Sequence, residues 1–546
     1  MEARSKKTRI LHYLMKYQQF VRSIAFLQNT FFLYRFSDHF WMLATGMFLT
    51  RIGGLSWVAI CLLISAAFKI SLSPVIGAAL DRTHRLTGMQ SVIAARICST
   101  IVSSVLFFLS LRAKEDGNQS EADWLMIGAV LLNALACVAT EAQRTLVTKD
   151  WVVVIVSQSK KANISTQNSM LTLVDQLAGI LAPACCGLFV DGLGLRATAL
   201  FVAGWSVASW AIEASVMWYV YKITPALRER AEGGELDAPA EKSSLSASDA
   251  GCCDRALGAW GIYHKQRCFL AAFGLALLYM TVLGFDNHEI AYAVSQGLSA
   301  TAVGTFRSFG CLFGALGALV YPVLERRFGV LVTAIVGLAI QNVFINLCSL
   351  STLLPGNPFD SIGYFETTTF NSWRRDAYLS FIGNTTMLNE ASSVSSSLPS
   401  HSVPAPVYLF FSGLMLARFG LWIADPSITQ IMQQIVPEAD RCTVFGMQTG
   451  VAEFFSILKD FLILAFPLTR TFGMLVCLSC LFVFFGFLFN LAFFIKVNFN
   501  FQQSQYKGEM IRSKILRISL LIYSIYTIYA IGIYDLLICI YFLLFL

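Results

Sequence analysis

The sequence predicts an all-α polytopic membrane protein with twelve transmembrane helices in two six-helix halves. Hydrophobic residues make up 56% of the 546 residues and charged residues only 13%, and the mean hydropathy is +0.63. The surface of a soluble globular chain of this length carries more charge than that. Apolar windows of about 20 residues, the length that crosses a bilayer, recur twelve times along the chain.

The windows form two groups of six on either side of a polar stretch. They lie near 25–51, 55–79, 89–111, 123–147, 164–190 and 196–221, and near 267–296, 301–323, 329–354, 405–436, 443–468 and 472–496. The predicted domains are a cytoplasmic amino terminus (1–24), a first half (25–222), a flexible cytoplasmic linker (223–266), a second half (267–496) with an extracellular loop (355–404), and an apolar tail (497–546). The linker is rich in Glu, Ala, Ser and Gly. The tail is either a thirteenth helix or spurious sequence, and we assign it no function.

Loop charges predict the orientation. Basic residues cluster in alternate loops, at the amino terminus, at Arg82 and Arg85, in the linker, and at Arg326 and Arg327. By the positive-inside rule both ends face the cytoplasm. The formal charge of +7 therefore reports orientation, and we expect no nucleic-acid partner.

The first window contains an unusual group of polar residues. Residues 31–50 read FFLYRFSDHFWMLATGMFLT, with Arg35, Asp38 and His39 near the middle. A charged side chain at the centre of a membrane helix costs about 2.5–3.5 kcal/mol, so it faces a partner or a water-filled path. Asp38 therefore needs a cation, which is either Arg35, one turn earlier, or a transported ion.

Two loops repeat a charged motif. After the second window the chain reads Gly77-Ala-Ala-Leu-Asp81-Arg82-Thr-His-Arg85, and Gly317 to Arg327 echoes it after the eighth window. The motif resembles the loop signature of the major facilitator superfamily. Such loops hold helices together at the cytoplasmic face in one state and release them in the other, and internal repeats of this kind build alternating access.

Four further segments resemble the ferroportins, the solute carrier family forty iron exporters, over most of residues 24–496. They are Thr148-Lys-Asp150-Trp151-Val-Val-Val, Asp175 to Pro183, Leu278 to Asp286, and Arg418-Phe-Gly-Leu-Trp422, in the order that this family requires. The resemblance implies that the chain is a metal transporter.

The resemblance implies an amino-terminal metal site at Asp38, Met42 and Asp175, with Met42 in the place of the family's His. Carboxylates suit hard or borderline dications, whereas a thioether favours softer metals; packing is the alternative role for Met42. His39 is expected to point to another part of the helix unless the helix is unwound there. The prediction requires that the two carboxylates are not both neutralised by fixed bases.

The resemblance also implies a second site whose expected ligands are absent. Asn287 stands in place of a Cys and Lys459 in place of a His. Asp286 and His288 supply other donors beside a helix that breaks at Gly284. Lys459 either takes the electrostatic place of the cation near Asp286 or pairs with Asp460. Because the missing Cys is the one that engages hepcidin in vertebrate ferroportins, we do not expect hepcidin control.

A calcium site is implied by mammalian ferroportins but departs from their pattern. The corresponding residues here are Asp38, Arg96, Ser206, Ser209 and Glu213. Arg96 replaces a neutral Gln, and calcium needs six to eight oxygen ligands. We therefore prefer an ion pair between Arg96 and Glu213 to a calcium site.

The family's cytoplasmic gate is better preserved. The residues at corresponding positions are Asp81, Arg85, Asp150, Asn168, Asp425, Gln430 and Arg441. All of them could equally be solvated surface charges. Their positions at helix ends near one face favour a switching network.

These features together predict a monomeric, multi-pass plasma-membrane protein that exports a dication by alternating access. The substrate that the ferroportin resemblance implies is Fe²⁺, with Co²⁺, Mn²⁺ and Zn²⁺ as further candidates, and no cofactor is expected. Metal binding to buried carboxylates releases protons, which offers proton coupling. The rival hypotheses are a facilitator of organic cations or other small solutes and a transport-inactive, receptor-like relative. No nucleophile with an oriented base occurs, so we expect no enzyme.

Overall fold

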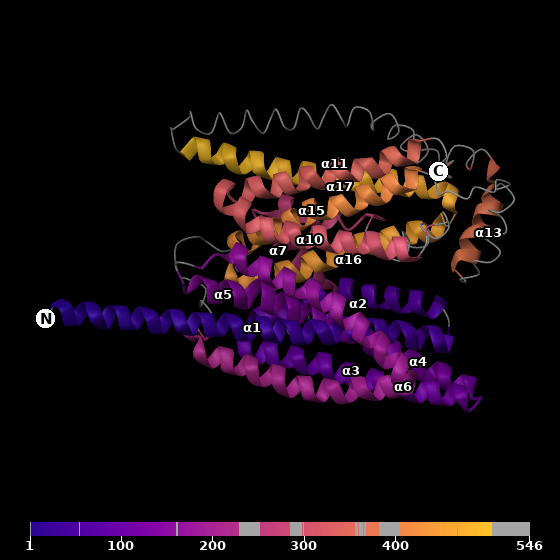
Figure 1. Cartoon of the computed structure of the whole chain (residues 1–546), viewed down its shortest axis with the longest axis horizontal. Coiled ribbons are helices and arrows are strands. Elements are labelled where there is room, and N and C mark those ends of the chain that lie inside the picture. Colours follow the sequence, from indigo (N-terminus) through magenta and orange to yellow (C-terminus); the bar gives the residue numbers. More distant parts are fainter. Residues whose placement is uncertain are drawn as a thin grey trace. The chain divides into compact units, whose positions relative to one another are not determined.

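The fold is helical throughout the part of the chain that the structure describes (Figure 1). The structure is a computed structural model, and it describes residues 2–53, 55–159, 162–228, 252–283, 298, 300–354, 359, 364, 367–381, 405–466 and 468–504. Within these ranges there is no β-strand, and eight helices are long and apolar enough to cross a membrane. The predicted all-α membrane fold is confirmed.

The helices follow the predicted windows closely. In chain order they are α1 (Glu2–Gly53), α2 (Leu55–Arg82), α3 (Arg85–Glu115), α4 (Gln119–Thr145), the π-helix η1 (Leu146–Trp151), α5 (Val152–Ser157), α6 (Ile164–Ile223), the 3-10 helix η2 (Pro225–Leu227), α7 (Cys252–Lys265), α8 (Phe269–Leu277), α10 (Ala300–Phe328), α11 (Val330–Leu353), α13 (Phe370–Phe381), α15 (Ala405–Ile435), the 3-10 helix η3 (Glu438–Asp440), α16 (Arg441–Ala465) and α17 (Thr469–Ser504). Gly194, at φ 80°, breaks α6 between two predicted windows, a conformation that glycine adopts at little cost.

The end of the predicted flexible linker is a helix, and this part of the prediction is wrong. Residues 252–265 form α7, which packs against α2. The ring of Phe269 lies edge-on against Trp260, Tyr263 and His264, so aromatic packing orders this segment. Residues 229–251 and the predicted tail from residue 505 lie outside the described residues.

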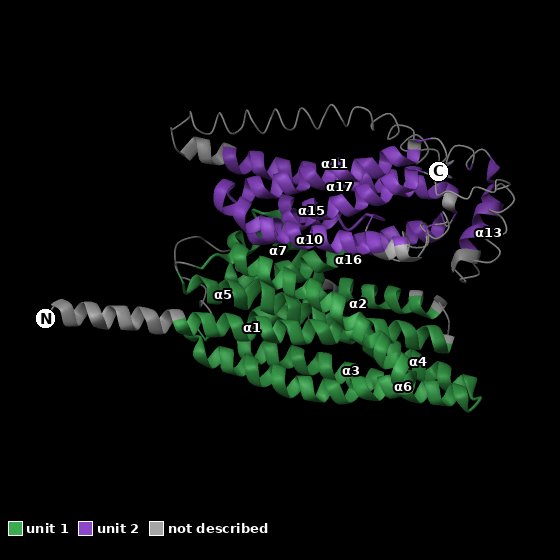
Figure 2. Ribbon diagram, viewed as in Figure 1, with its two compact units in different colours: residues 1–269, 432–453 green, residues 270–431, 454–546 purple. Residues whose placement is uncertain are grey.

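The chain divides into two compact units (Figure 2). The first unit contains residues 1–269 together with residues 432–453, and the second contains residues 270–431 and 454–546. Residues 432–453 comprise the end of α15, η3 and the first half of α16. This late segment therefore packs with the amino-terminal helices, where it meets several of the predicted gate residues.

Each unit has its own apolar core. In the first unit α1 packs along α6, and α3 packs on both α4 and α6 (Figure 1). Trp151 and Tyr34 are fully buried there, and Cys442 of the late segment joins the same core. In the second unit α11 packs against α17, and Phe410, Phe411 and Val476 are buried. Because lipid is as apolar as these side chains, close packing and not removal from water stabilises the contacts between such helices.

Candidate functional site

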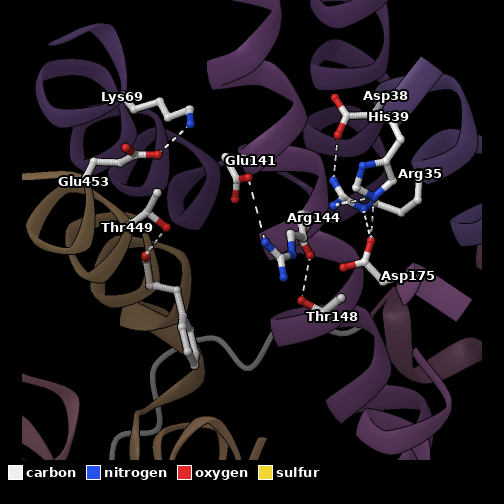
Figure 3. Close-up of polar contacts among 11 residues, drawn as sticks. Arg35, Asp38, His39, Lys69, Glu141, Arg144, Thr148, Asp175, Thr449 and Glu453 are labelled. Atoms are coloured by element: carbon white, nitrogen blue, oxygen red, sulfur yellow. Dashed lines mark hydrogen bonds and ion pairs between the residues drawn. The ribbon is translucent and has the colours of Figure 1, made fainter. Parts of the chain in front are cut away.

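The centre of the candidate metal site is occupied by a guanidinium group. Arg35, Asp38 and His39 lie three and four residues apart on α1 and so share one side of that helix. Asp175 approaches them from α6, so Asp38, His39 and Asp175 all contact the Arg35 side chain (Figure 3).

One guanidinium binds both predicted metal-binding carboxylates. Arg35 donates from Nη1 to Asp38 Oδ2 at 2.7 Å and from Nε to Asp175 Oδ1 at 2.5 Å. The Arg35 side chain is 8% exposed, and those of Asp38 and Asp175 are 25% and 14% exposed. Of the two predicted partners of Asp38, Arg35 is the one found. Both acids are thus neutralised by a base of the chain itself, so a metal ion can bind them only after Arg35 has moved aside.

His39, and not Met42, faces Asp175, so the expected direction of His39 is wrong. His39 Nε2 lies 3.4 Å from Asp175 Oδ1 and 3.3 Å from Arg35 Nη2, although α1 is helical throughout. Gly179, one turn beyond Asp175 on α6, lies beside the imidazole, and a Cβ there would be in ordinary van der Waals contact with Nε2 at 3.5 Å. Met42 is 64% exposed. The sequence signal that we missed is the four-residue spacing from Arg35 to His39.

No three His, Cys, Asp or Glu side chains are grouped as a metal site anywhere in the described ranges. Asp38, His39 and Asp175 are nevertheless held close to one cation. The arrangement supplies two carboxylates and an imidazole, which are donors suited to borderline dications such as ferrous iron.

Four further charged residues lie in the same unit, and we call them the charge row: Lys69, Glu141, Arg144 and Glu453 (Figure 3). Lys69 Nζ lies 2.5 Å from Glu453 Oε1, and Arg144 Nη1 lies 3.8 Å from Glu141 Oε1. Glu141 also interacts electrostatically with Arg35 and Asp175. Sequence reasoning missed the charge row, in which Lys69 and Glu453 lie in separate apolar windows and Glu141 and Arg144 lie three residues apart in a third.

The predicted gate residue Asp81 caps a helix. Its Oδ1 accepts from the backbone N–H of Cys442 at 3.0 Å, and its Oδ2 accepts from the backbone N–H and the hydroxyl of Thr443 at 2.7 and 2.8 Å. These donors lie in the first turn of α16, where backbone N–H groups have no partner within the helix. A carboxylate there also complements the positive end of the helix dipole.

A second set of gate contacts centres on Asp150, in the π-helix η1. Arg85 donates to it through Nε at 2.8 Å and Nη2 at 3.3 Å, and Arg441 Nη1 donates at 3.3 Å. Arg85 also binds Glu438 of η3. A π-helical turn inside a helix is rare and frequently marks a functional site. The predicted gate residues Asp81, Arg85, Asp150 and Arg441 therefore come together within one unit.

Asn168 joins this network through a residue that we did not predict. Its Nδ2 donates to Gln433 Oε1 at 2.8 Å, and Gln433 Nε2 donates to the carbonyl oxygen of Thr148 at 2.8 Å. Gln433 and Glu438 were missed because the sequence does not show which residues contact Asn168 and Arg85. We call Asp81, Arg85, Asp150, Asn168, Gln433, Glu438 and Arg441 the gate cluster.

Between the gate cluster and Lys69, α2 and α16 touch backbone to backbone. A Cβ added at Gly77 would collide with the carbonyl oxygen of Cys442, and one at Gly446 with that of Ser73. With the Asp81 cap at one end and the Lys69–Glu453 pair at the other, these contacts form a continuous antiparallel line, the α2–α16 seam.

Helix α7 is attached to α16 by a buried phenol. Tyr263 donates its hydroxyl to Gln448 Oε1 at 2.7 Å. Burial raises the pKa of Tyr263 above its usual value, so the phenol keeps the proton that it donates. The end of the linker is therefore connected to the helix that carries the seam.

The other predicted residues are placed elsewhere or lie outside the described residues. Gln430 contacts Glu325 at 3.2 Å and Tyr321 within the second unit, and Asp425 is half-buried on the same helix, α15. Their gate role stays a prediction. Lys459 Nζ lies 3.4 Å from Asp460 Oδ1, which is the pairing alternative. Asp286, Asn287 and His288 lie outside the described residues.

The candidate calcium site contains the expected ion pair. Arg96 Nη2 donates to Glu213 at 2.7 and 2.8 Å, and Gln143 Nε2 donates to Glu213 Oε2 at 2.9 Å. Ser206 and Ser209 are buried, and the Ser209 hydroxyl donates to the Ser206 carbonyl oxygen at 3.1 Å. The preference for an Arg96–Glu213 ion pair is confirmed.

The fold is that of a multi-pass helical membrane protein with the major facilitator architecture. The chain resembles the crystal structure of a Major Facilitator Superfamily (MFS) transporter, FucP, in the outward conformation, with a TM-score of 0.53 and 13% identity over 87% of this chain and 99% of that one. It resembles the crystal structure of a bacterial homologue of iron transporter ferroportin in outward-facing state more closely, with a TM-score of 0.67 and 18% identity over 86% and 99% of the two chains.

The chain belongs to the ferroportin family. The family profile described as Ferroportin1 (FPN1) matches residues 22–483. Solute carrier family 40 member 1 of Danio rerio is 27% identical over 531 residues, which cover 88% of this chain and 93% of that protein. The family assignment made from the four sequence segments is confirmed, and the protein is a transporter-family member and not an enzyme.

Proposed function

We propose that this protein exports a divalent metal ion, ferrous iron above all, across the plasma membrane by alternating access. The solved structures that it resembles include a bacterial homologue of the iron transporter ferroportin. The observation that carries the proposal is that Asp38 and Asp175, from α1 and α6, already converge on a single cation. Two carboxylates with a nearby imidazole suit Fe²⁺, and they accommodate Co²⁺, Mn²⁺ or Zn²⁺ as well.

In this proposal the gate cluster closes the cytoplasmic side. Its contacts link the end of α2, η1 and α6 to residues 432–453. Breaking them frees that segment from the amino-terminal helices, and re-forming them locks it again. Both acids are already ion-paired with Arg35 and therefore deprotonated, so metal binding displaces this cation and releases no proton from them.

The test is efflux of radioactive iron from cells that express the full chain. The double variant Asp38→Ala plus Asp175→Ala should reduce efflux to the level of untransfected cells, while the exposed Asp116→Ala should leave it unchanged at equal surface expression. Wild-type efflux from the double variant would reject the assignment of the metal site.

A further inference from the structure

Arg35 lies where a transported metal would have to bind. Its guanidinium contacts a carboxylate of α1 at 2.7 Å and a carboxylate of α6 at 2.5 Å, and His39 Nε2 lies 3.3 Å from Nη2 (Figure 3). A dication that used both carboxylates would occupy the same space as the guanidinium. Arg35 and the metal therefore exclude one another.

We propose that Arg35 is a tethered counter-cation, which neutralises Asp38 and Asp175 while the site holds no metal and which an arriving dication must displace. The inference rests on the proposed function. It adds a residue that sets the affinity of the site, acting by competition and not by coordination, because a guanidinium has five donors and no acceptor.

Electrostatics explains why a cation of the chain stabilises the empty site. Two carboxylates close together in a poorly solvated site repel one another and lose hydration. Without any cation, both effects would destabilise the empty site. A guanidinium stays charged under all conditions found in proteins, so it offsets these costs whenever no metal is bound. A dication carries twice the charge of the Arg35 guanidinium, so its attraction to the two carboxylates is stronger and it can displace the guanidinium.

The surroundings give the displaced side chain other contacts. The Arg35 guanidinium carbon lies 5.8 Å from the centre of the Tyr34 ring, a distance at which a cation is attracted to the ring face. Glu141 of the charge row also interacts electrostatically with Arg35. Displacement therefore requires a side-chain rotation toward neighbouring groups and no unfolding of α1.

Calorimetric titration of the purified full chain with Co²⁺ tests the inference. Arg35→Met keeps an unbranched but shorter side chain and removes the competing charge, and Co²⁺ should bind at least about tenfold more tightly, which corresponds to about 1.4 kcal/mol. Arg35→Lys keeps one charge but cannot bridge two carboxylates, so an intermediate gain of about threefold is expected. Unchanged or weaker binding by Arg35→Met would overturn the inference, because a purely structural arginine lowers stability without improving affinity. If Arg35→Met does not fold, the same criterion applies to Arg35→Lys.

The control is Arg112→Met, which makes the same change in charge beside the exposed Asp116 and outside the candidate site. Its Co²⁺ affinity should stay within about threefold of wild type, and a gain equal to that of Arg35→Met would show a general charge effect and reject the competitor role. Asp38→Ala plus Asp175→Ala separates the two proposals. If this double variant binds Co²⁺ like wild type, the metal site itself is wrong; if it abolishes binding while Arg35→Met gives no gain, only the role of Arg35 is wrong.

Discussion

Thr443, at the start of α16, donates two hydrogen bonds to one carboxylate oxygen of Asp81, at the end of α2. The backbone N–H lies at 2.7 Å and the hydroxyl at 2.8 Å from Asp81 Oδ2. These residues are 362 positions apart in the sequence. The contact joins the amino-terminal helices to the segment 432–453 at the cytoplasmic end predicted from loop charges.

Asp81→Ala should loosen the start of α16. The change leaves three donors without their acceptor, and hydrogen bonds to a charged group contribute about 1.5–3 kcal/mol each. Cys442 is 1% exposed and lies directly in this turn. Its labelling by a water-soluble maleimide, followed by peptide mass spectrometry, should accelerate by about tenfold or more. Asp116→Ala, at an exposed acid, is the matched control, and equal labelling rates in the two variants would contradict the role of the cap.

Gly446→Ala should impair transport through the α2–α16 seam. The added Cβ would collide with the carbonyl oxygen of Ser73, a backbone atom that cannot move aside alone. Overpacking of this kind costs about 1–3 kcal/mol, so iron efflux should fall by about fivefold or more. The control is Gly204→Ala on α6, where nothing lies within 4 Å of the new Cβ. Normal efflux from Gly446→Ala would show that the seam has no part in the cycle.

The seam shows what the sequence predicts and what it does not. Hydropathy predicts the helices because each membrane-spanning segment must satisfy its own backbone hydrogen bonds in the bilayer. Helices α2 and α16 accordingly coincide with the windows near 55–79 and 443–468. The loop motif predicted Asp81 as a gate residue. Neither signal names the partner, because Cys442 and Thr443 come close only after the helices pack.

Only part of the candidate metal site was predicted, because contacts between helices cannot be read from the sequence. Asp38 and Asp175 were found from the resemblance, and Arg35 from its spacing on the same helix. His39 was placed wrongly because helix periodicity alone does not show which side of α1 faces Asp175 of α6. The Lys69–Glu453 pair of the charge row required a contact between α2 and α16, which charges in separate windows do not specify, whereas the Glu141–Arg144 pair lies within α4.

The Lys69–Glu453 ion pair should be required at the far end of the seam. Each side chain is about one-fifth exposed, and Nζ lies 2.5 Å from Oε1. Glu453→Lys places two ammonium groups together, and this should lower the thermal unfolding midpoint and iron efflux. Lys69→Glu plus Glu453→Lys restores opposite charges at the same positions and should recover most of both. A double variant as defective as the singles would show that the two residues act independently.

Arg96→Gln should create a calcium response that the wild-type chain lacks. In the structure Arg96 bonds to both oxygens of Glu213, so the pocket already contains its cation. Glutamine keeps a polar side chain but removes the positive charge, which leaves Glu213, Ser206 and Ser209 to offer oxygens to Ca²⁺. The unfolding midpoint of purified Arg96→Gln protein should rise with millimolar Ca²⁺, because a ligand that binds only the folded state stabilises it. The wild-type midpoint should not move, and Arg96→Gln combined with Glu213→Gln should lose the response. A calcium response in the wild type, or none in Arg96→Gln, would mean that the Arg96–Glu213 pair does not control this pocket.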